Sequence, residues 1–174
     1  MMRTILWTIW GLVPVAVLAF HFGPGQHLAA RDLAARLQVD AIEAERAAMT
    51  AQDDAYAAHL ATNELRRQAF LGSDAALGAR LEAAIATEER LYAVAAAAWE
   101  EAADAYEHVE SALTDRPGPE RDRVRLARAR ALVRSGDIWG GADELEVLLM
   151  ELDDADQGSS ELARATREEL AGAH

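Results

Sequence analysis

Residues 79–113 read ARLEAAIATEERLYAVAAAAWEEAADAYEHVESAL and contain neither glycine nor proline. Alanine, glutamate, arginine and leucine dominate the run, and all four favour the α-helix. Leu81 and Ile85 in this run continue a four-residue spacing that begins at Leu77, which is typical of one helix face. The run predicts either one helix or two helices that meet at an alanine-rich bend near residues 95–98.

The flanking sequence has the same composition and no run of alternating β-branched residues, so the predicted fold class is all-α. A first helix is expected to begin near Gln26 or His27, and a further helical stretch to end near Leu71, where Gly72 can cap it. The large apolar residues expected along one face of the first helix are Leu33, Leu37, Ile42 and Met49.

Towards the C-terminus, the clearest loop is residues 114–119, TDRPGP. Pro119 suits a first helical position, and the helix that follows should end at Ser135, with Gly136 as its cap. Asp137 is expected to cap a second helix with an apolar stripe that ends at Leu152. A last short helix is expected over residues 160–170.

Small and large apolar residues follow Gly136 in a regular order: Ile138, Gly141, Leu145 and Leu148. The same offsets from Ala97 give Trp99, Ala102, Tyr106 and Val109. This order resembles the second helix of a tetratricopeptide repeat, although Ala97 replaces the turn glycine. Arg125 and Arg128 also stand where that family prefers apolar residues. The resemblance implies helical hairpins at about 78–113 and 119–152, in a short α-solenoid or bundle.

The N-terminal segment is apolar, because residues 5–22 contain no charged side chain and follow Arg3. As a helix, these residues would extend roughly 27 Å, which suits a bilayer core. We therefore expect a transmembrane anchor over residues 1–22 with its N-terminus inside, and a membrane-exit turn at 23–26. The alternative is a signal peptide cleaved after Ala19. Both place the helical domain of residues 27–174 on the extracytoplasmic side, which is the periplasm if the protein is bacterial.

Composition argues against several classes of function. The chain has 30 acidic and 17 basic residues, a net charge of −13, no cysteine and no lysine. A nucleic-acid ligand is disfavoured because phosphate binding needs a basic surface. The sequence lacks paired Glu-x-x-His motifs, His-Glu-x-x-His, a phosphate-binding loop and a Gly-x-Ser-x-Gly elbow. We expect no catalytic residue, no metal ligand and no cofactor.

The basic residues are gathered, because residues 116–134 hold seven of the arginines. Such a patch could bind an acidic partner protein. The candidate partner-binding residues are Arg121, Arg125, Arg128, Arg130 and Arg134. The alternative is internal charge balance, because neighbouring helices supply carboxylates at Glu100, Glu101, Asp104, Glu107 and Glu144.

The sequence favours a non-enzymatic adaptor or scaffold, anchored in the inner membrane, that binds another protein of a membrane-associated complex. The alternative is a structural stalk that resembles the b subunit of a rotary ATP synthase, in which a membrane helix continues into a long helix rich in alanine and glutamate. The glycine and proline breaks in this sequence, such as Gly72 and Pro117, oppose that alternative.

Overall fold

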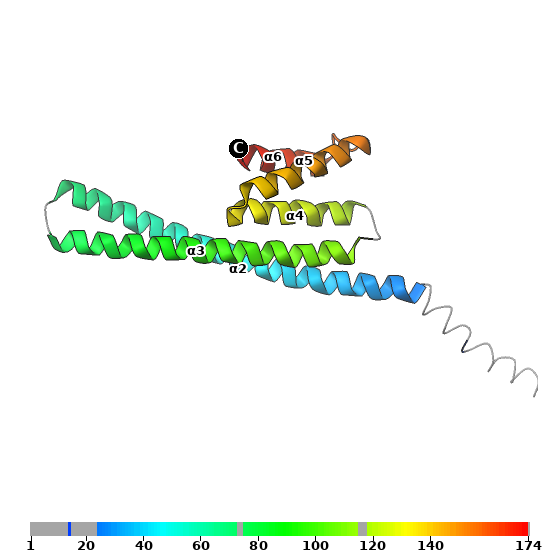
Figure 1. Cartoon of the computed structure of the whole chain (residues 1–174), viewed down its shortest axis with the longest axis horizontal. Coiled ribbons are helices and arrows are strands. Elements are labelled where there is room, and N and C mark those ends of the chain that lie inside the picture. Colours follow the sequence, from blue (N-terminus) through cyan, green and yellow to red (C-terminus); the bar gives the residue numbers. More distant parts are fainter. Residues whose placement is uncertain (1–13, 15–23, 73–74, 115–117, 174) are drawn as a thin grey trace, which may run out of the picture.

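The computed structural model describes residue 14 and residues 24–72, 75–114 and 118–173. Within these ranges the chain forms five labelled helices and no strand, so the all-α prediction is confirmed. The helices are α2 (Pro24–Leu71), α3 (Ala75–Ala112), α4 (Pro119–Ser135), α5 (Ile138–Asp154) and α6 (Glu161–Ala173). The first two form a long hairpin, and α4, α5 and α6 stack against one end of it (Figure 1).

Alanine makes up most of the buried residues that α2 contributes to the hairpin. Ala34, Ala41, Ala48 and Ala55 of α2 recur every seven residues and are all buried, and Thr62 continues the series. We call these five residues the alanine stripe. A seven-residue repeat of buried positions is the pattern of a coiled coil, and small side chains allow the two helix axes to approach closely.

The facing residues of α3 follow the same period but are larger. Trp99, Tyr106 and Leu113 are buried at seven-residue spacing, and Ala95, Ala102 and Val109 form a second such series. Ala41 packs in one cluster with Tyr106 and Val109, whereas Ala48 packs with Trp99 and Ala102. The two helices are therefore antiparallel, and large side chains on α3 fill the space left by the alanines of α2.

Two predictions about these helices are wrong. Residues 75–112 form one continuous helix, which is the first of the two alternatives predicted for this run. The predicted hairpin at 78–113 and the alternative bend near residues 95–98 are therefore wrong. Alanine favours the helix most strongly, and Ala95 and Trp99 are buried in the contact with α2, so nothing favours a break there. In α2, Leu33 and Met49 are exposed instead of facing the core, because the alanines occupy the buried positions.

The hairpin predicted at 119–152 corresponds to α4 and α5. Gly136 adopts the left-handed conformation, with φ 105°, and the Asp137 carboxylate accepts a hydrogen bond from the backbone N–H of Gly140 at 3.0 Å. A Cβ on Gly141 would lie 2.8 Å from the carbonyl oxygen of Ala129. The two helices can therefore cross this closely only because residue 141 is glycine.

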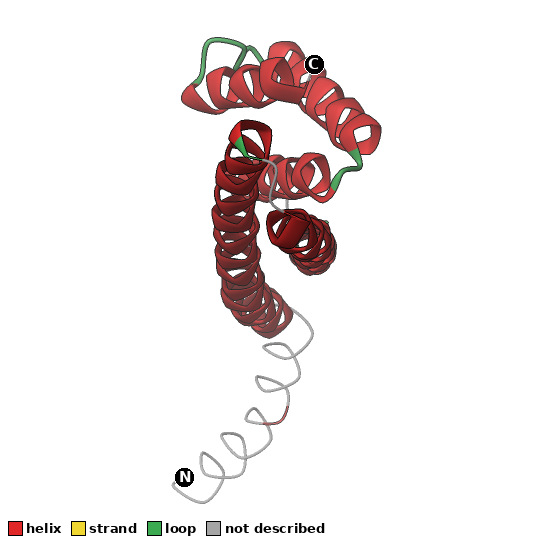
Figure 2. Cartoon of the chain, turned by 90° about the vertical axis from the view of Figure 1, so that its left-hand side faces the viewer, coloured by secondary structure: helices red, strands yellow, loops and turns green. Residues whose placement is uncertain are grey.

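Three clusters of buried side chains hold α4, α5 and α6 in place, two of them shared with the hairpin. Val124 of α4 joins the cluster of Ala34 and Tyr106, and Ala131 joins that of Trp99. A separate cluster unites α4, α5 and α6 through Leu126, Ala129, Leu145, Leu148, Leu152 and Ala163. Figure 2, seen along the hairpin, shows the layers following one another from α2 and α3 to α6.

The membrane predictions concern the beginning of the chain. The anchor at residues 1–22 lies outside the described residues, apart from Pro14. None of the helices that the structure describes is long and apolar enough to cross a bilayer. The exit turn predicted at 23–26 is wrong for Pro24, Gly25 and Gln26, which belong to α2. Proline fits there because the first turn of a helix needs no backbone N–H donor.

Candidate partner-binding face

The predicted binding arginines all lie on α4, whose start follows from its sequence. Pro119 occupies the first turn, and Glu120 and Asp122 place negative charge at the positive end of the helix dipole. Val124, Leu126, Ala129 and Ala131 are buried. The arginines lie between these apolar positions, which brings their guanidinium groups to the edges of the contacts with α3, α5 and α6.

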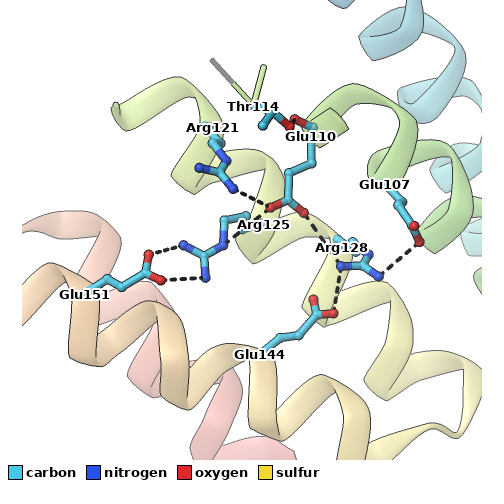
Figure 3. A network of polar contacts seen from close by, with 8 residues as sticks. All are labelled: Glu107, Glu110, Thr114, Arg121, Arg125, Arg128, Glu144 and Glu151. Atoms are coloured by element: carbon cyan, nitrogen blue, oxygen red, sulfur yellow. Dashed lines mark hydrogen bonds and ion pairs between the residues drawn. The ribbon is translucent and has the colours of Figure 1, made fainter. Parts of the chain in front are cut away.

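Three arginines of α4 surround the carboxylate of Glu110 of α3, and we call these ion pairs and those of the same arginines with other carboxylates the arginine network (Figure 3). The Glu110 carboxylate lies 3.3 Å from Arg121, 3.8 Å from Arg125 and 3.7 Å from Arg128. The Glu110 side chain is only 17% exposed, so water screens these pairs less than it screens pairs on an open surface. One carboxylate therefore holds three of the five predicted arginines.

Two of these three arginines also form ion pairs with α5. Arg125 pairs with Glu151, and Arg128 lies 2.8 Å from Glu144 and 3.1 Å from Glu107 of α3. Figure 3 shows Arg125 and Arg128 between the carboxylates of α3 and those of α5. The arginine network consequently ties α3 to α5 through α4.

The remaining two arginines are also engaged within the chain. Arg130 donates a hydrogen bond of 2.6 Å to Glu169 of α6. Arg134 places its guanidinium 4.9 Å from the centroid of the Trp99 ring, which is a cation–π distance. Each of the five arginines thus contacts another helix of the same chain. For Arg121, Arg125, Arg128 and Arg130 the partners are carboxylates. This is the internal charge balance predicted as the alternative, with Glu107 and Glu144 among the carboxylates named for it.

Burial shifts the pKa values of two acidic residues near the arginine network. Burial raises the pKa of Glu144, against the opposing effect of Arg128. Burial also raises the pKa of Asp122, and Arg125 again opposes it. A shallow cleft of about 220 Å³ lies beside Glu144, lined by Glu110, Arg125, Arg128, Asp143, Glu144 and Val147. Its lining consists mostly of charged side chains, which the surrounding helices hold in fixed positions.

A second polar cluster lies in the hairpin, and the sequence reasoning missed it. His59 donates from Nδ1 to Glu88 at 2.7 Å and accepts at Nε2 from Asn63 at 2.8 Å. Arg66 lies 3.6 Å from the second oxygen of Glu88. The seven-residue spacing of Glu45, Gln52, His59 and Arg66 is the signal that could have revealed these contacts.

Gln52 and Glu45, which lie nearer the start of α2 than His59, make the equivalent contacts with α3. Trp99 Nε1 donates to Gln52 at 2.9 Å, and the Tyr106 hydroxyl donates to Glu45 at 2.5 Å. A step of seven residues along α2 is therefore matched by a step of seven back along α3. These pairs fix the antiparallel alignment.

The described ranges bring no three histidine, aspartate or glutamate side chains into an arrangement that could hold a metal ion. The two clusters described above consist of ion pairs and hydrogen bonds between helices. Such contacts hold the helices of this chain together.

Comparison with known proteins gives no relative: no family model, no curated protein and no solved structure matches this chain.

Proposed function

We propose that the protein is a non-enzymatic adaptor, anchored in the membrane by residues 5–22, whose helical domain binds a partner protein on the extracytoplasmic side. The observation that carries the proposal is the arginine network. Glu110 of α3 contacts three arginines of α4, and two of these arginines also pair with α5. Arg130 of α4 adds α6 through Glu169, so α4, α5 and α6 are held together at one end of the long hairpin. A rigid surface of this kind binds without first ordering its own helices.

The likeness to a tetratricopeptide repeat now rests on α4 and α5 alone. Their turn at Gly136 and their close crossing at Gly141 are what that family would supply. A single hairpin is not an array, so we propose that α3 covers one side of it and α6 the other. The buried positions of Val124 and Ala163 support this arrangement.

The adaptor proposal is tested by affinity capture of the full chain from native membranes in mild detergent. We expect a stoichiometric partner with the unaltered chain and with Arg36→Ala, which alters an exposed arginine of α2. Replacing Arg121, Arg125 and Arg128 together by glutamate should loosen the α4–α6 unit and reduce recovery at least tenfold. Failure to recover any stoichiometric partner with the unaltered chain overturns the proposal.

A stalk remains the second candidate, and the length of the hairpin favours it. The 48 residues of α2 extend about 72 Å at the usual helical rise. A stalk like the ATP synthase b subunit would continue away from the membrane, however, whereas this chain turns back into α3 (Figure 1).

The two candidates respond differently to a shorter hairpin. Deleting residues 59–65 and 86–92 together removes one matched heptad from each helix, and it leaves the pairing of Gln52 with Trp99 in place. An adaptor that binds through α4–α6 keeps its partner after this deletion. A stalk of fixed span loses assembly of its complex.

A further inference from the structure

One face of α5 is exposed to solvent and carries both apolar and acidic side chains. Its residues, spaced along one side of the helix, are Trp139, Asp143, Glu146, Val147, Met150 and Asp154, and all six are exposed. We call this set the α5 outer face. The buried residues of the helix, such as Leu145 and Leu148, lie on the opposite side.

The apolar members of the face are large and open to solvent. Trp139 is 78% exposed and Met150 is 60% exposed, and Val147 lies between them in the sequence. Tryptophan and methionine are enriched at protein interfaces, and tryptophan most often dominates the binding energy. A further apolar cavity of about 240 Å³ lies at the Trp139 end, lined by Ile138, Trp139, Ala142 and Ala173.

The charge of the face has one sign. Helix α5 contains no basic residue. Its carboxylates at Glu144 and Glu151 are paired with α4, and Asp153 lies 3.5 Å from Arg167. Among the described residues, no ion pair neutralises the three carboxylates of the outer face, Asp143, Glu146 and Asp154. The face thus combines apolar contact area with three carboxylates that form no ion pair with the described residues.

We propose that the α5 outer face binds a basic amphipathic helix of a partner protein, with apolar residues that cover Trp139, Val147 and Met150 and arginine or lysine beside the three carboxylates. This inference deepens the proposed adaptor function by naming the surface and the chemistry of the partner. It also reverses the charge expected from sequence, because the arginines of α4 already contact other helices of this chain.

Charge complementarity selects this occupant over the alternatives. A symmetric contact between two copies would bring six carboxylates and no basic residue of either α5 into one interface, and like charges in one interface repel. An anionic lipid surface would repel the face for the same reason. A basic helix gains from both the apolar and the acidic residues.

The test is photo-crosslinking of the full chain in native membranes. The probe is benzoylphenylalanine in place of Met150, and the control is the same probe in place of Leu60, an exposed apolar residue of α2. Mass spectrometry identifies the segment attached to residue 150. We expect an amphipathic helical segment with a net positive charge, at a yield at least tenfold above the control position.

Two variants separate the two halves of the surface. Trp139→Ala, and the triple change Asp143→Asn, Glu146→Gln, Asp154→Asn, should each lower the adduct yield about tenfold while the thermal unfolding midpoint stays within a few degrees. High salt should reduce the yield of the unaltered surface, whereas the triple variant should be almost insensitive to salt.

Several results overturn the inference. They are an adduct with a second copy of the chain, with lipid or with an acidic segment, a yield equal to that of the control position, or no adduct. If affinity capture still recovers a partner in such a case, the adaptor function stands and only this surface is wrong. If capture fails as well, both proposals fall.

Discussion

Arg134 of α4 lies over the ring of Trp99 of α3, with 4.9 Å between the guanidinium carbon and the ring centroid, while the indole N–H donates to Gln52 of α2. One side chain of α3, only 1% exposed, therefore contacts both α2 and α4. The hairpin and the α4–α6 unit meet at this tryptophan, and its removal should weaken both.

Trp99→Ala should lower the free energy of unfolding by about 3–5 kcal/mol, because it leaves a large cavity beside Ala48 and Ala102. Arg134→Gln should cost about 0.5–1 kcal/mol, since it removes only the cation–π contact. Chemical denaturation measures both. The control is Val94→Ala at an exposed position of α3, and an equal cost for Val94→Ala and Trp99→Ala would contradict this role of the tryptophan.

The same substitution should have opposite effects at two glycines. Gly141→Ala places a Cβ 2.8 Å from the Ala129 carbonyl oxygen and should destabilise by about 1–3 kcal/mol. Gly78→Ala, within α3, meets nothing within 4 Å and should stabilise by about 0.5–1 kcal/mol through helix propensity. Thermal unfolding distinguishes the signs, and stabilisation by Gly141→Ala would show that α4 and α5 do not cross so closely.

The alanine stripe should resist enlargement. Ala48→Leu inserts three carbon atoms where the side chain is fully buried against α3, and we expect a loss of about 1–3 kcal/mol or more. Ala47→Leu is the matched control because residue 47 is exposed and leucine is a good helix former. Comparable unfolding midpoints for the two variants would argue against a tight contact between α2 and α3.

Glu88 should contribute to the acid sensitivity of the hairpin. The hydrogen bond from His59 lowers the pKa of Glu88 from its ordinary value of 4.5, against the opposing effect of burial. Its contribution is therefore fully present above about pH 4.5 and is lost as the pH falls through the lower folded-state pKa. Glu88→Gln should flatten the fall of stability with pH in that range, whereas Glu89→Gln, at an exposed neighbour, should not.

The sequence predicted those elements that local residue chemistry determines. Gly136 and Asp137 define the turn between α4 and α5, and Pro119 defines the start of α4, because each acts within its own few residues. The long hairpin was missed for a physical reason. Its buried positions in α2 are alanines, whereas the prediction followed larger residues such as Leu33 and Met49, which are exposed.

The candidate site was predicted as a cluster but not as a set of contacts. Seven arginines in residues 116–134 are visible in the sequence, and so are the carboxylates around them. The sequence does not show that Glu110 would lie within reach of three arginines, because that depends on how α3 and α4 align. The α5 outer face could have been predicted from the spacing of Trp139, Val147 and Met150 opposite Leu145 and Leu148.

The antiparallel alignment of α2 and α3 also determines how the molecule responds to a pulling force. The start of α2 and the end of α3 lie at the same end of the hairpin, so tension applied between them peels the helices apart one heptad at a time. The first contacts to bear the load lie in the cluster of Ala34, Ala41, Tyr106 and Leu113, which Val124 of α4 covers. The contacts of α4 with that end of the hairpin therefore determine the force at which α2 and α3 begin to separate.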